Sequence, residues 1–246
     1  MNNAELIVAT LKKAGITHGF GIPSGNVLPV MEAMRNGGIE FVLTAHEGSA
    51  AFAADVTGRQ TDRPGFCIAT LGPGATNLTT GVGNAWLDRS PLLAITCNLN
   101  TDQLGRRIQM YIDHHALFAP ITKASFALRH GDVAGPLAEA IRISMTEPRG
   151  PVHLDLPEDV ALAPATEDVP EFGIPEPVFP APRDMIKRAA GMIAEAKRPI
   201  AVLGSSAMRI FDKDLLRQFI EHHKIPFMTT TMGKGLIDDD HPLALG

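Results

Sequence analysis

Short apolar runs of strand length alternate with helical patterns along most of this chain. Gly65 to Leu71 and Pro91 to Cys97 are such runs, and helical stretches lie beside them at Gly48 to Arg59 and Thr76 to Leu87. A strand without polar alternation is buried on both faces, as in a parallel sheet covered by helices. The chain is therefore predicted to be an α/β protein with a parallel sheet flanked by helices. Further helices are predicted at 3–14, with Asn3 as the N-cap, and at 27–35, with strands at 18–23, 40–45 and 152–156.

Residues 163–182 differ from the rest because prolines recur among acidic residues, which excludes a regular helix or a central strand. We interpret them as an extended linker between a domain at 1–162 and a second one at 183–246. The second segment has only about 64 residues, and its strand and helix signals continue the α/β pattern. It is expected to be a truncated Rossmann-like α/β domain.

Composition excludes several classes of function. The chain has 246 residues and a formal net charge of -5, without a basic run, so nucleic acid is not an expected partner. No apolar run approaches the ~20 residues that span a bilayer, and no secretory signal opens the chain. Cys67 and Cys97 both lie in apolar runs without C-x-x-C spacing. We expect buried free thiols, no membrane association and a cytoplasmic location.

Two motifs lie where a strand gives way to a helix, which is where α/β sheets bind ligands. The first is Thr44 to Ala51, which contains Glu47, and the second is Leu71 to Asn77, with the sequence Leu-Gly-Pro-Gly-Ala-Thr-Asn. Taken alone, Glu47 is interpreted more readily as a helix cap, and the glycine motif is equally compatible with a tight turn capped by Thr76 or Asn77. The second motif is neither a Walker A loop nor G-x-G-x-x-G, which argues against a generic dinucleotide-binding domain.

Taken together and in order, these motifs resemble the pyrimidine-binding domain of thiamine-diphosphate enzymes. The resemblance is closest to the group of acetolactate synthase, pyruvate oxidase and the 2-oxoacid decarboxylases. It rests on Gly19 to Pro23, His46-Glu47, Gly72 to Asn77, Asp88 to Leu92 and Gly150 to Pro157. After the linker, Arg198 to Ile200, Thr231 to Gly235 and Asp240 to Leu243 resemble the central domain of the same family.

The resemblance implies a role for each matching residue. A glutamate in this family hydrogen-bonds N1′ of the aminopyrimidine ring, and Glu47 occupies its position. A protonated Glu47 would favour the imino form of the ring, whose 4′-nitrogen then takes the proton from the thiazolium C2, so that the protein sets the tautomer of the cofactor. Pro23, Gly25, Pro73 and Asn77 are the other expected cofactor-binding residues.

One departure from the family concerns the catalytic region. Acetolactate synthases usually carry Phe-Gln-Glu before the segment that is Pro120 to Lys123 here, whereas this chain has Gln109 to His115. His114 or His115 is a candidate to replace that glutamine as a proton donor, because histidine titrates near neutral pH. The alternative is a histidine pair at the surface or at a helix cap.

A second departure is the absence of Gly-Asp-Gly with its downstream Asn, which binds Mg²⁺ and the diphosphate in the family. We therefore expect no metal ligands here and Mg²⁺ binding by a domain absent from this chain. FAD is a further candidate cofactor.

The resemblance implies a homo-oligomer, at least a dimer, that acts on pyruvate or another 2-oxoacid. The expected function is that of the amino-terminal portion of an acetolactate synthase-like carboligase. The alternatives are a 2-oxoacid decarboxylase, another carboligase of the family, or a non-catalytic scaffold fragment.

Overall fold

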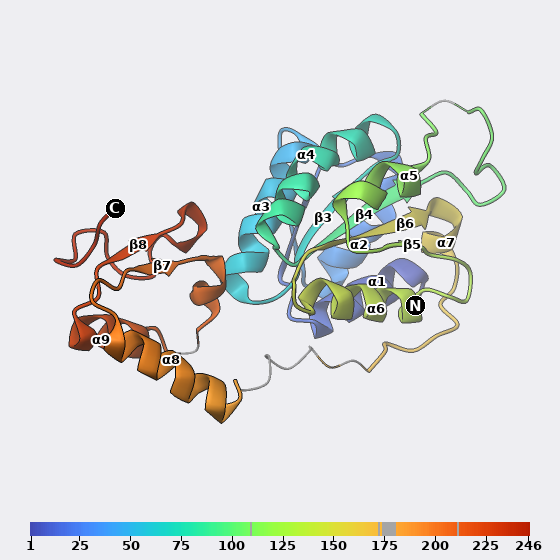
Figure 1. The fold of residues 1–246 in the computed structure, drawn as a ribbon. Helices are drawn as coiled ribbons and strands as arrows, with labels where there is room; N and C mark the ends of the chain where they lie inside the picture. Colours follow the sequence, from blue (N-terminus) through green and yellow to red (C-terminus); the bar gives the residue numbers. More distant parts are fainter. Residues whose placement is uncertain (109, 172, 174–180, 211) are drawn as a thin grey trace. The chain divides into compact units, whose positions relative to one another are not determined.

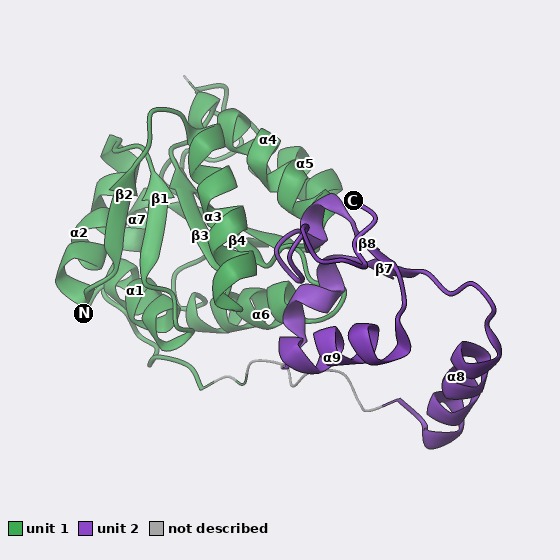
Figure 2. Cartoon of the chain, turned by 90° about the vertical axis from the view of Figure 1, so that its left-hand side faces the viewer, with its two compact units in different colours: residues 1–176 green, residues 177–246 purple. Residues whose placement is uncertain are grey.

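The computed structural model describes residues 1–108, 110–171, 173, 181–210 and 212–246 (Figure 1). The chain divides into two compact units, residues 1–176 and 177–246 (Figure 2). This division falls within the segment 163–182 that the sequence singles out as a linker. Residues 172 and 174–180 of that segment lie outside the described residues, as does Gln109 of the catalytic departure.

Unit 1 is built on a sheet of six strands, and every pair of neighbours is parallel. In spatial order the strands are β2 (Glu40–Leu43), β1 (His18–Gly21), β3 (Gly65–Ala69), β4 (Leu92–Asn98), β6 (Pro151–Pro157) and β5 (Ser125–Ala127). The prediction of an α/β fold with a parallel sheet is confirmed. Because all strands run the same way, their carboxyl ends share one edge, and the loops that follow them meet there.

Helices cover both faces of this sheet, as Figure 1 shows. One face packs against α1 (Asn3–Lys13), α2 (Leu28–Gly37), α6 (Ala134–Met145) and α7 (Glu158–Leu162). The other packs against α3 (Glu47–Thr61), α4 (Pro73–Asp88) and α5 (His114–Phe118). Strand β3 contributes large side chains, Phe66 and Ile68, to the first face and small ones, Cys67 and Ala69, to the second. Small side chains on the second face let α3 and α4 approach the strands closely.

The cysteines are free and buried, as predicted, and they belong to cores on opposite faces of the sheet. Burial raises the pKa of both thiols well above the ordinary range, and the negative charges of Asp155 and Glu158 add to this at Cys97. Neither thiol is poised to react.

The predicted start of α1 at Asn3 is confirmed, whereas its predicted N-cap and the predicted start of α4 were wrong. The N-cap of α1 is Asn2 instead of Asn3, because Asn2 Oδ1 accepts from the Glu5 amide while Glu5 Oε2 accepts from the Asn2 amide, both at 2.9 Å. Helix α4 begins at Pro73 instead of Thr76. Proline suits the first helical position, where its missing N–H costs nothing.

Unit 2 has a small parallel sheet of its own, formed by β7 (Ala201–Leu203) and β8 (Phe227–Thr229), together with α8 (Arg183–Glu195) and α9 (Lys213–His223). Leu203, Ile220 and Phe227 lie in its core. Among the described residues of both units, no helix is long and apolar enough to cross a membrane.

The close approach of α3 to β3 depends on Gly65, since a Cβ there would overlap the carbonyl group of Ala54. Gly65→Ala is expected to lower the free energy of unfolding of unit 1 by about 1–3 kcal/mol through overpacking. Gly83→Ala in helix α4 is the matched control, because a Cβ at that position would have no neighbouring atom nearer than 3.8 Å. Urea unfolding followed by the fluorescence of Trp86, the single tryptophan, measures both. Equal midpoints would contradict this account.

Candidate active site

Three loops of unit 1 meet at the carboxyl edge of the sheet, around the point where the strand order reverses. The order β2-β1-β3-β4 places this switch point between β1 and β3. The loop with Pro23 and Gly25 follows β1, the turn that leads to Glu47 follows β2, and the turn from Thr70 to Pro73 follows β3. Ligands of open α/β sheets bind in such a crevice.

Glu47 is the first residue of α3 and is only 9% exposed. The capping role that the sequence left open for it falls to His46, whose Nδ1 accepts from the Gly48 amide at 3.0 Å. The carboxylate of Glu47 instead faces the glycine loop. Its Oε2 accepts a 2.9 Å hydrogen bond from Asn77 Nδ2 on α4. Two residues proposed from separate motifs are thus in direct contact.

The glycine loop presents its backbone to this carboxylate. Gly72 has φ +60°, a left-handed conformation that favours glycine, and Pro73 follows as the first residue of α4. A Cβ on Gly74 would lie 3.5 Å from Glu47 Oε1, so the missing side chain leaves that oxygen accessible. Within the described part of the chain, the buried hydroxyl of Thr70 has no hydrogen-bond partner. An acid, an amide, a bare backbone and an unpaired hydroxyl form a donor set that suits a flat polar heterocycle.

Pro23 and Gly25 are both exposed and lie beside the short 3₁₀ turn Gly25–Val27. Asn26 anchors this turn, because its Nδ2 donates to the carbonyl of Asn98 at 3.3 Å and to Glu158 Oε2 at 2.9 Å. The loop is thereby held at the ends of β4 and β6. Among the described residues, no hydrogen bond joins Pro23 or Gly25 to Glu47.

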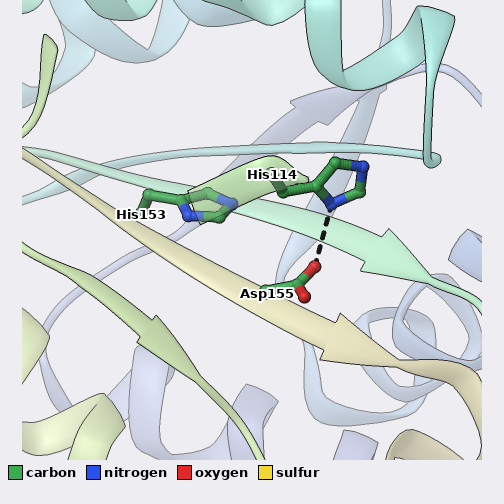
Figure 3. A group of neighbouring side chains, drawn as sticks. All are labelled: His114, His153 and Asp155. Atoms are coloured by element: carbon green, nitrogen blue, oxygen red, sulfur yellow. Dashed lines mark hydrogen bonds and ion pairs between the residues drawn. The ribbon is translucent and has the colours of Figure 1, made fainter. Parts of the chain in front are cut away.

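His114 is buried, with 1% of its surface exposed, so the surface alternative is wrong for this residue. The cap of α5 is Asp113, which accepts from the Ala116 amide at 3.0 Å. His114 Nε2 accepts a hydrogen bond from the Gly72 amide at 3.4 Å. Its Nδ1 lies 2.9 Å from Asp155 Oδ1 (Figure 3). His114 therefore connects the glycine loop to the interior of the sheet.

A chain of hydrogen bonds continues from this pair across three strands. Thr96 Oγ1 on β4 lies 2.9 Å from His114 Nδ1 and 2.8 Å from His153 Nε2 on β6. His153 Nδ1 lies 2.6 Å from Ser125 Oγ on β5, which in turn lies 2.6 Å from His115 Nδ1. We call these residues, together with Asp155 and Asn98, the histidine network.

The strand register produces this network. Thr96 pairs with Asp155 and Ser125 pairs with His153, so each set of partners shares one face of the sheet. Phe118 of α5 covers the network by stacking on His153, with the ring centres 4.3 Å apart and the planes at 9°.

The electrostatics of the network follow from its burial. Burial alone would raise the pKa of Asp155, but hydrogen bonds from His114 and from Asn98, whose Nδ2 lies 3.0 Å from both carboxylate oxygens, lower that pKa below its usual value. Burial lowers the pKa of His153 to about 3, and Asp155 offsets this only in part. Asp155 is therefore ionised and His153 neutral at physiological pH.

His114, His153 and Asp155 each offer a ligand atom within 4.8 Å of the others, which is the spacing of a metal site (Figure 3). The Thr96 hydroxyl, however, already lies within 3.3 Å of all three side chains. The arrangement is a closed hydrogen-bond network, in which a cation would have to displace that hydroxyl.

A pocket of about 530 Å³ opens beside the network at the carboxyl edge. Its lining includes His114, His115, Asp155, Tyr111, Arg129 and His130. The side chain of His115 is 40% exposed, and its Nε2 lies 3.9 Å from Asp155 Oδ2. Both adjacent histidines line the pocket, and His115 is the more exposed of the two.

Thr96, Ser125, His153 and Asp155 were missed as functional candidates. The signal for two of them was visible, since His153 and Asp155 interrupt an apolar strand at alternate positions and so must share one face. Their partners on β4 and β5 could be found only from the strand register.

The fold defines an α/β protein in which an acid, an amide and a glycine loop meet at the switch point of a parallel sheet. Residues 1–117 match the family described as thiamine pyrophosphate enzyme, N-terminal TPP binding domain. Residues 186–246 match the central domain of thiamine pyrophosphate enzymes. The chain belongs to the thiamine pyrophosphate enzyme family.

Curated relatives align with the whole chain. It is 38% identical to a probable acetolactate synthase large subunit of Methanocaldococcus jannaschii, with 100% of this chain and 43% of that protein covered. It is 35% identical to the acetolactate synthase isozyme 2 large subunit of Escherichia coli, with 100% and 45% covered. It is also 35% identical to the acetolactate synthase large subunit of Corynebacterium glutamicum, with 100% of this chain and 40% of that protein covered. The chain thus spans less than half the length of these relatives.

The low pKa of His153 predicts an acid-sensitive fold. The unfolded chain takes up a proton at this histidine below pH 6.5, whereas the folded chain resists until about pH 3. The free energy of unfolding is therefore expected to fall by about 1.4 kcal/mol per pH unit from this group as the pH drops below 6.5. Asp155 adds a loss only at lower pH, below its unfolded value of 3.8.

Urea unfolding of His153→Gln at several pH values tests this, because the variant should lose less stability than the parent between pH 6.5 and about 4.5. His18→Gln, which removes a partly exposed imidazole in the same unit, is measured beside it as the matched histidine substitution. Parallel slopes for the parent and His153→Gln would refute the prediction.

Proposed function

We propose that this chain supplies the pyrimidine side of a thiamine-diphosphate site, with Glu47 as the acid that contacts the pyrimidine ring. Membership of the family supports this, and the observation that carries it is the burial of Glu47 against Asn77 and Gly74 at the switch point. When bound, the cofactor supplies a nucleophilic carbon that adds to the carbonyl of a 2-oxoacid.

The geometry also supports a definite place for the proton on Glu47. Asn77 donates to Oε2, so a proton on the carboxyl group resides on Oε1. That oxygen faces Gly74, where no side chain blocks it. A protonated Glu47 therefore presents its donor on the side of Gly74, where a ring nitrogen is proposed to approach.

Pro23, Gly25, Pro73 and Asn77 are proposed to hold the ring. Asn77 orients the acid, and Pro73 lines the approach as the exposed first residue of α4. Pro23 and Gly25 belong to the loop after β1, on the other side of the switch point. Mg²⁺ and the diphosphate are proposed to be held by a diphosphate-binding domain, and FAD by the central domain if the enzyme uses a flavin.

For the proton donor to substrate we propose His115. His114 has both ring nitrogens engaged, by Gly72 and by Asp155, and so acts as a positioning residue. His115 lines the pocket, and its Nε2 makes no hydrogen bond within the described chain, with Asp155 Oδ2 3.9 Å away.

The proposed reaction is carboligation, in which one 2-oxoacid loses carbon dioxide and its remaining carbons join a second 2-oxoacid. With pyruvate as the substrate the product is 2-acetolactate, in line with the names of the curated relatives. A homo-oligomer, at least a dimer, is the proposed assembly.

A 2-oxoacid decarboxylase is the second candidate, because a histidine in the pocket supplies a proton that could release an aldehyde in place of a ligated product. Pyruvate consumption with parallel assays for acetolactate and acetaldehyde, on the protein expressed from its full-length gene, separates the two.

Glu47→Gln and Glu47→Ala in that full-length protein are expected to lower kcat at least about 100-fold, because neither side chain holds a carboxyl proton. The unfolding midpoint should change little, since Glu47 lies at a helix start outside both hydrophobic cores. Glu32→Gln, on the exposed surface of α2, is the control that should keep full turnover. Turnover within threefold of the parent in either Glu47 variant would remove the proposed role.

A further inference from the structure

We propose that the histidine network is directional. It holds the imidazole protons of His114 and His153 on Nδ1 and that of His115 on Nε2, with Ser125 and His153 as positioning residues for His115. The steps follow from which atoms can only donate or only accept and, at Thr96, from the shorter of two distances.

The direction is set at the glycine loop. A backbone N–H can only donate, so the Gly72 amide at 3.4 Å requires His114 Nε2 to be the acceptor. The proton of His114 then lies on Nδ1, which donates to Asp155 Oδ1 at 2.9 Å. The Asn98 amide also lies 3.4 Å from Nδ1, but its shorter contacts, at 3.0 Å, are to the two Asp155 oxygens. Asp155 is ionised and can only accept.

Thr96 passes the direction to the next histidine. Its hydroxyl has one hydrogen, and the two remaining acceptors are His153 Nε2 at 2.8 Å and Asp155 Oδ1 at 3.3 Å. The shorter distance assigns the hydrogen to His153, because O–H donors prefer separations near 2.8 Å. His153 is neutral, so with Nε2 accepting, its proton lies on Nδ1.

Ser125 completes the chain. His153 Nδ1–H donates to Ser125 Oγ at 2.6 Å, and the single hydrogen of that hydroxyl then goes to His115 Nδ1, also at 2.6 Å. The proton of His115 is left on Nε2, the nitrogen that lies 3.9 Å from Asp155 Oδ2. The reverse direction would force Thr96 to donate over the longer 3.3 Å separation.

The consequence for catalysis rests on the proposed function. If His115 gives a proton to a bound 2-oxoacid, the network decides that Nε2 carries it, and Ser125 and His153 keep the ring in place without touching the substrate. The assignment of tautomers does not rest on that function, since it concerns only hydrogen bonds within unit 1.

Two-bond ¹H–¹⁵N spectra of the 246-residue chain, labelled with ¹⁵N at the histidine rings, read the tautomers near neutral pH. Single His→Gln variants assign the signals of His114, His115 and His153. The expected pattern is Nδ1–H for His114 and His153, which is the minor tautomer of histidine in water, and Nε2–H for His115. A proton on Nε2 of His153 or on Nδ1 of His115 overturns the proposal.

Ser125→Ala breaks the chain at one hydroxyl. It is expected to change the tautomer ratios of His115 and His153 about tenfold, the effect of one lost hydrogen bond, and to leave His114 unchanged. Ser125→Thr keeps the hydroxyl and should restore the parent pattern. Ser144→Ala, which removes another buried hydroxyl bonded to Ile141, is the control. Unchanged signals for both His115 and His153 in Ser125→Ala also overturn the proposal.

Turnover of the full-length enzyme is a separate measurement. A loss of kcat in Ser125→Ala that Ser125→Thr recovers supports the link to His115. Altered tautomers with unchanged turnover would remove His115 from the reaction and leave the directional network standing.

Discussion

The parallel pairing of six strands is the constraint on which the candidate site depends. It aligns every carboxyl end at one edge, so residues from loops far apart in the chain meet there without a long excursion. Glu47 follows β2 and Asn77 lies in the helix after β3, yet their side chains are 2.9 Å apart. The same pairing sets Thr96 beside Asp155 and Ser125 beside His153, which builds the histidine network on one face of the sheet.

Burying a carboxylate is costly unless its oxygens are supplied with donors, and an unpaired buried charge costs several kcal/mol. Asp155 meets this demand through His114 and Asn98, and the histidines in turn find partners in Gly72, Thr96 and Ser125. The network is thus satisfied at each nitrogen that faces the interior. Because His114 also receives the Gly72 amide, the turn that carries Pro73 and Gly74 toward Glu47 is tied to the same group of buried polar side chains.

Much of the fold could be predicted from hydrophobic pattern, because the strands at 65–71 and 91–97 are apolar on both faces. The helix ends were harder to predict from sequence. Asn3 is as good a capping residue type as the observed N-cap Asn2, and Thr76 is as plausible a helix start as the observed Pro73. Glu47 and Asn77 could be named from motifs, but their hydrogen bond could not. The roles of Thr96 and Ser125 required the register of β4, β6 and β5, which no local pattern contains.

The alternation of side chains along β6 makes the network sensitive to a particular kind of evolutionary change. His153 and Asp155 face α5, whereas Val152, Leu154 and Leu156 face the opposite core. Inserting or deleting one residue within this strand would exchange the two sets of side chains. Aliphatic side chains would then replace the imidazole and carboxylate in the network, and the carboxylate would lie in the hydrophobic core. The length of this strand is therefore constrained by the alternation of its side chains. Indels in descendants of this gene should therefore be purged from β6 and tolerated in the loops that flank it.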